Sequence, residues 1–156
     1  MRPAVVNRLK AAAGVASLVG TRVYERQGPY GGISRDATPE AFSDPDHELL
    51  DSLVVWLELR RASPEKGMGP ETITAEQTIA VAALTAAPGF DGCRALLRAV
   101  KPVLHRPTPK LSPVADQVTW VDTRWSNDGP EVIEPELGVP MIVARFTAVI
   151  VENLTP

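Results

Sequence analysis

The segment from Met141 to Val151 most constrains the fold, because it is apolar at almost every position. A strand with one solvent-exposed face alternates between apolar and polar residues, whereas this run has apolar side chains on both faces. It is also too short to cross a bilayer as a helix, which takes roughly 20 apolar residues. We therefore predict a central β-strand covered on both faces, either by other parts of the chain or by a neighbouring subunit.

Three further runs have β character. Residues 50–61 and 72–85 place aliphatic side chains at alternate positions, and the Gly- and Pro-containing tip Ser63–Pro70 joins them, as is typical of a long hairpin. The alternate positions of the first run, predicted to form one continuous aliphatic face, are Leu53, Val55, Leu57 and Leu59. The third run, Val118–Trp125, is separated from the final strand by the turn-rich residues 126–130, and we expect Val132–Ile133 to extend it.

Two segments have helical periodicity. In the first, apolar side chains recur from Val5 to Ala16, with Pro3 at the start and Gly20 as the expected stop. In the second, Asp91 is the expected N-cap and Pro102 is expected to kink or end the helix. The buried stripe of the second helix comprises Cys93, Leu96, Leu97, Val100, Val103 and Leu104.

These elements predict an α/β protein of the α+β type. We expect a mixed, mainly antiparallel sheet of about four strands, with two main helices packed on it. A chain of 156 residues is long enough to bury about two-thirds of its unfolded surface, so we predict a single domain over residues 1–156.

The segment from Glu25 to His47 is rich in Gly and Pro and poor in aliphatic residues. A loop this long in a compact domain is usually functional, and this one looks too polar to build core. We therefore expect it to contact partners through Tyr30 and Phe42. The hairpin tip is the second expected partner-contact loop, and its contact residues are Glu65, Lys66 and Met68.

Few residues are suited to catalysis. The chain has 2 His and 1 Cys, and Cys93 falls on an apolar stripe without a partner for a disulfide. The only dense group of potential metal ligands lacks the spacing of a known cation loop; it consists of Asp44, Asp46, His47 and Glu48. We find neither a nucleophile motif nor a glycine-rich phosphate loop, and so predict no catalytic, cofactor-binding or metal-binding residues. The alternative to a protein without such sites is a small hydrolase or ligand-binding domain, in which residues 36–51 would form the entrance to the binding site.

Charge is unevenly distributed along the chain, although the formal net charge is only −3. Residues 36–51 hold six acids and no base, residues 89–110 hold five bases and one acid, and residues 111–140 hold six acids and one base. Ordinary solvated surface is the simplest explanation. The sharper one is a head-to-tail interface, in which the basic face of one copy meets an acidic face of the next. The predicted subunit contacts are Arg94, Arg98, Lys101, Trp125, Glu131 and Glu134.

The overall charge also argues against free binding to nucleic acid. The first residues lack the apolar core and the cleavage site of a signal peptide, so we expect a soluble intracellular product.

The N-terminal part of the chain contains Leu9-Lys10-Ala11 and, further on, the stretch Leu18-Val19-Gly20-Thr21-Arg22-Val23-Tyr24. A loop, two β runs, the helix Cys93–Leu104 and a C-terminal β pair follow. This layout resembles the small tail-completion proteins of long-tailed bacteriophages, and within them the tail terminator family. A head-side neck adaptor is an alternative that the sequence does not separate from the terminator.

The resemblance implies a structural virion protein, not an enzyme, that needs no cofactor. It would cap the tail tube as a hexameric ring at the head-proximal end, stop tube polymerisation and join tail to head. The implied partners are further copies of the chain, the tail tube protein and the head-side connector protein. DNA would pass through the ring lumen without sequence-specific contact, and assembly would take place in the host cytoplasm, away from any membrane.

Overall fold

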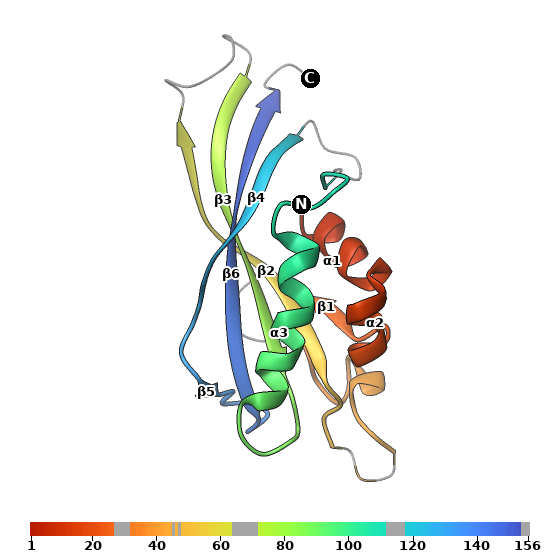
Figure 1. Ribbon diagram of the computed structural model, residues 1–156. Helices are drawn as coiled ribbons and strands as arrows, with labels where there is room; N and C mark the ends of the chain where they lie inside the picture. The colour runs from red at the N-terminus through yellow and green to blue at the C-terminus, as the bar shows by residue number, and fades with distance from the viewer. Residues whose placement is uncertain (27–31, 45, 47, 64–71, 112–117, 154–156) are drawn as a thin grey trace.

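The computed structural model describes residues 1–26, 32–44, 46, 48–63, 72–111 and 118–153 (Figure 1). Its helices are α1 (Arg2–Ala11), α2 (Ala13–Val19), the 3-10 helix η1 (Pro39–Ala41) and α3 (Asp91–Leu104). Its strands are β1 (Val23–Glu25), β2 (Ser52–Ser63), β3 (Thr72–Leu84), β4 (Val118–Asp128), β5 (Val132–Ile133) and β6 (Pro140–Asn153).

The strands form one mixed sheet in the order β1-β2-β3-β6-β4, and β5 pairs with β6 beyond the end of β4. Only β1 and β2 run parallel, so the predicted mainly antiparallel α+β fold is confirmed, with six strands rather than about four. β2 and β3 form the predicted hairpin. β6 lies between β3 and β4, as expected for its two apolar faces.

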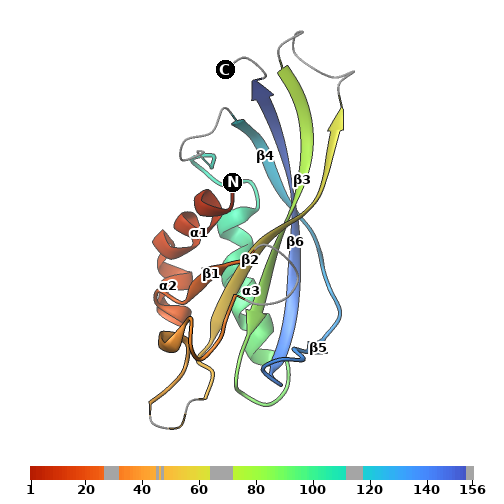
Figure 2. The ribbon, with the colours of Figure 1, turned by 180° about the vertical axis from the view of Figure 1, so that it is seen from behind.

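The three α-helices cover one face of the sheet (Figures 1 and 2). On this face Phe146 and Ile150 of β6 are fully buried against α1, α2 and α3, together with Leu97 and Leu104 of α3. Small residues of β6, such as Ala144, let the helices approach the sheet closely.

The opposite face of the sheet is covered by residues of the long loop, and we call the described residues 33–44, 46 and 48–50 the acidic segment. Its side chains Ile33, Ala41, Phe42 and Leu49 pack against Val54, Trp56, Ala80, Ala82, Leu84 and Val143 of the sheet. Phe42 is only 8% exposed and pairs with Leu49 in an isolated β-bridge. The expectation that this loop builds no core and offers Phe42 to a partner is therefore wrong. Its few apolar residues are interspersed with polar ones along the sequence, and only the folded chain brings them together.

Three local predictions need correction. The first helical segment is two helices, because Ala12 is extended (φ −78, ψ 119) and separates α1 from α2. Phe90 is the N-cap residue of α3, whereas Asp91 lies in its first turn and accepts a hydrogen bond from Arg94. The aliphatic face of β2 ends at Leu57, because a β-bulge follows and leaves Leu59 58% exposed.

Other expectations hold. Gly20 ends α2 with a positive φ of 59, which glycine adopts without strain. Pro102 lies inside α3, which ends two residues later. Trp56 and Trp120 are buried. Within the described residues, no helix is long and apolar enough to cross a membrane.

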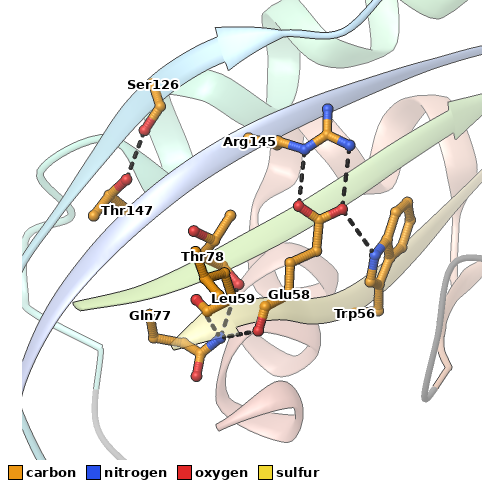
Figure 3. A network of polar contacts seen from close by, with 8 residues as sticks. All are labelled: Trp56, Glu58, Leu59, Gln77, Thr78, Ser126, Arg145 and Thr147. Carbon is orange, nitrogen blue, oxygen red and sulfur yellow. Dashed lines mark hydrogen bonds and ion pairs between the residues drawn. The ribbon is translucent and has the colours of Figure 1, made fainter. Parts of the chain in front are cut away.

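A polar network lies on the face of the sheet opposite the helices (Figure 3). Arg145 donates two hydrogen bonds to the carboxylate of Glu58, at 2.9 and 3.1 Å, and Trp56 Nε1 donates to the same carboxylate at 3.2 Å. The guanidinium of Arg26 lies 3.8 Å from the centre of the Trp56 ring. The ion pair between Glu58 and Arg145 links β2 to β6 across the small Ala80 of β3, and so stabilises the arrangement of three strands.

Candidate functional site

The predicted basic stripe lies on the outer face of α3. Arg94, Arg98 and Lys101 follow one another at helical spacing, and all three are at least partly accessible to solvent. Two of them are neutralised within the chain: Arg94 pairs with Asp91 at 3.0 Å and also with Glu131, and Lys101 pairs with Asp128 at 2.7 Å. Arg98 has no ion pair within the part of the chain that the structure describes.

Trp125 stands beside this stripe on β4 and is 41% exposed. It pairs with Phe146, whose side chain points to the helical layer, so Trp125 faces the same side. Its indole Nε1 donates to Asp128 at 3.0 Å, and the ammonium of Lys101 lies 4.7 Å from the ring centre. Its backbone N–H donates to Nδ1 of His105 at 3.0 Å. The contacts with Asp128 and Lys101 orient the exposed indole, and the His105 contact anchors its backbone.

A shallow hollow of about 210 Å³ runs along the base of these side chains, between α3 and the end of β4. Its lining includes Leu97, Arg98, Lys101, Asp128, Glu131 and Ile142. We call Trp125, Arg98 and this hollow the tryptophan surface. It offers an aromatic plane, one unneutralised cation and a partly apolar floor, which suits contact with another protein better than chemistry on a small substrate.

The two acidic residues of the predicted interface, Glu131 and Glu134, are both engaged within their own subunit. Glu134 is only 4% exposed, and its carboxylate accepts a hydrogen bond from the backbone N–H of Leu137 within the turn between β5 and β6. This residue therefore stabilises a turn, and its expected exposure to a neighbouring subunit is wrong. Glu131 is accessible but pairs with Arg94 of its own chain. The sequence showed both charge blocks but not that they meet inside one subunit.

The outer edge of β4 is partly closed. The connector that follows α3 folds over it, and the N–H of Arg106 donates to the carbonyl of Thr123 at 2.7 Å. Together with the hydrogen bond from Trp125 to His105, this contact uses backbone groups that an added strand would need. Beside the connector, a groove of about 450 Å³ is lined by Pro107, Pro109, Leu111, Trp120 and Val121, among others.

The acidic segment carries its charges outward on the far side of the sheet. Asp36, Asp44, Asp46 and Glu48 are all exposed, and within the described residues none of these carboxylates takes part in an ion pair. A compact turn carries the first of them: the N–H and hydroxyl of Thr38 both donate to the carbonyl of Ser34, at 2.9 and 3.0 Å. Ser34 N–H donates in return to the Thr38 hydroxyl at 3.0 Å. This part of the sequence therefore presents a fixed acidic tip.

The described residues contain no group of three His, Cys, Asp or Glu side chains that could hold a metal ion. His47, one of the potential ligands, lies outside the described residues, as do the predicted partner-contact residues Tyr30, Glu65, Lys66 and Met68. Burial raises the pKa of Cys93 to about 11, which makes its thiol a poor nucleophile at neutral pH.

No family model matches this chain, and no curated protein is similar to it. The fold is similar to that of a chain in the solved structure of the virion of a native gene transfer agent particle. The TM-score is 0.63 at 20% sequence identity, and the match covers 96% of this chain and 93% of the other. The two chains therefore share a fold over almost their whole length.

Proposed function

We propose that this chain is a structural virion protein of a tailed phage or phage-like particle, and within that class a tail terminator. One observation carries the proposal: the fold is shared, from end to end, with a chain of a gene transfer agent virion. The resemblance of the sequence layout to tail-completion proteins points to the same class. The surface also suits assembly, since it combines an orientated exposed tryptophan with separate regions of unneutralised charge.

The mechanism we propose is geometric. A subunit with two different, complementary surfaces closes into a ring when the rotation between neighbours divides a full turn, and six copies would match a six-fold tail tube. The ring would occupy the growing surface of the last tube ring and so stop polymerisation. Its other surface would then be available to the head-side connector protein, and the DNA would pass through its lumen. No catalytic group or cofactor is needed for any of these steps.

Two measurements on particles test the proposal. Labelled copies of the chain should be found by electron microscopy at the head-proximal end of the tail, in a closed ring. Particles assembled without the chain should then have tails of uncontrolled length, because nothing ends tube growth. Tails of normal length that fail to join heads would instead indicate the neck adaptor role. Absence of the chain from purified particles would rule out both.

A further inference from the structure

The tryptophan surface has the features of a binding hot spot. Tryptophan and arginine are among the residues most enriched at such sites. Here Arg98 lines the hollow, and Trp125 contacts Lys101 and Asp128, which line it too. Two contacts, to Asp128 and Lys101, already restrain the indole of the tryptophan, so less conformational freedom remains to be lost on binding. The partner should carry a carboxylate, because Arg98 is the member of the α3 row that no described residue of its own chain neutralises in an ion pair.

The acidic segment of a second copy could supply the carboxylate that faces Arg98. Its tip is rigid before binding, because Ser34 and Thr38 hydrogen-bond to each other in both directions. Asp36 is exposed on that tip, and Asp44 and Asp46 follow as further exposed carboxylates that make no ion pair with any residue the structure describes. Unneutralised charges of one sign favour a cationic partner and disfavour an acidic one.

The two surfaces lie on opposite sides of the molecule. The tryptophan surface lies on the face of the sheet that carries α3. The acidic segment packs on the opposite face, where it also contacts the turn between β5 and β6. One subunit therefore cannot join its own two surfaces, but successive copies can join them head to tail.

We infer that the tryptophan surface binds the acidic segment of a second copy, with Trp125 against the tip and Arg98 facing Asp36. The inference rests on the proposed assembly in a virion and names the contact that builds it. In the other acidic block, Asp128 and Glu131 already pair with α3 of their own chain and Glu134 is buried, so these three carboxylates are not the partner.

A charge swap in the full-length protein tests the contact. Arg98→Glu and Asp36→Arg should each weaken self-association about fivefold, the upper range for an exposed ion pair, as measured by sedimentation velocity. The double variant should recover wild-type association to within about twofold. Arg61→Glu makes the same charge change on the exposed β2 end, away from both surfaces, and should have no effect. Thermal unfolding of each variant should match that of the wild type. If the two reversals are additive, with no recovery in the double variant, the inference is overturned.

Cross-linking gives an independent readout. Cys93 is buried, so new surface cysteines react selectively. A mixture of Arg98→Cys and Asp36→Cys chains should form a covalent dimer with a short bismaleimide, whereas either variant alone should not. A mixture of Arg61→Cys and Asp36→Cys is the matched control. A yield no higher than that of the control, in solution and in particles, would refute the inference.

The outcomes separate the contact from the function. Closed rings on tails that tolerate all these substitutions would leave the proposed function standing and overturn only the contact. Specific cross-linking of a chain that is absent from particles would support the contact and reject the virion role. A chain that is monomeric both in solution and in particles would reject the contact.

Discussion

Replacing Phe42 with alanine tests the main difference between the sequence prediction and the structure. The side chain is 8% exposed and packs in the loop-side core with Leu49 and Trp56. Truncating a fully buried Phe costs about 3–5 kcal/mol, from lost burial and from the cavity left behind. Phe42 also borders an open hollow of about 620 Å³, so water can fill part of the vacated space. We therefore expect the free energy of unfolding to fall by about 3 kcal/mol.

Urea unfolding followed by tryptophan fluorescence measures this change, and Trp56 reports from the same cluster. With a denaturant slope of about 1–3 kcal/mol per molar, the midpoint should fall by at least about 1 M. Leu59→Ala is the control, because Leu59 is 58% exposed and its loss should cost less than about 0.5 kcal/mol. A loss below about 0.5 kcal/mol for Phe42→Ala would show that Phe42 is not part of the core.

Further predictions concern a polar pair and two titratable groups. A double-mutant cycle of Glu58→Gln and Arg145→Met should give a coupling energy of about 1 kcal/mol, since the pair is bidentate but about a third exposed. Burial raises the pKa of Cys93 to about 11. The stability that the protonated thiol gives the folded protein is therefore complete below pH 9 and is lost as the pH rises towards 11, which a fall in the free energy of unfolding would report. In the folded protein this thiol should also resist a thiol-specific disulfide reagent that modifies it after unfolding. Burial, reinforced by the Glu40 carboxylate, raises the pKa of Tyr24 to about 12. In a Tyr30→Phe background, absorbance should show Tyr24 ionising near pH 12 when folded and near pH 10 in urea.

The order and type of the main elements could be predicted from the sequence, because hydrophobic periodicity depends only on which residues are neighbours. The two apolar faces of Met141–Val151 required a central strand, and β6 is one. The alternation in the two long runs before Asp91 predicted the β2–β3 hairpin. The mainly antiparallel α+β class followed from these patterns.

The tertiary structure alone decided what covers the second face of the sheet and which charges remain free. Four apolar residues scattered through an acidic loop become a core only when the chain brings them against Trp56. Likewise, Arg94 and Glu131 are far apart in sequence and looked like complementary ends of two subunits, yet they pair within one. Burial and pairing depend on distances in space, and a pattern along the chain does not contain those distances.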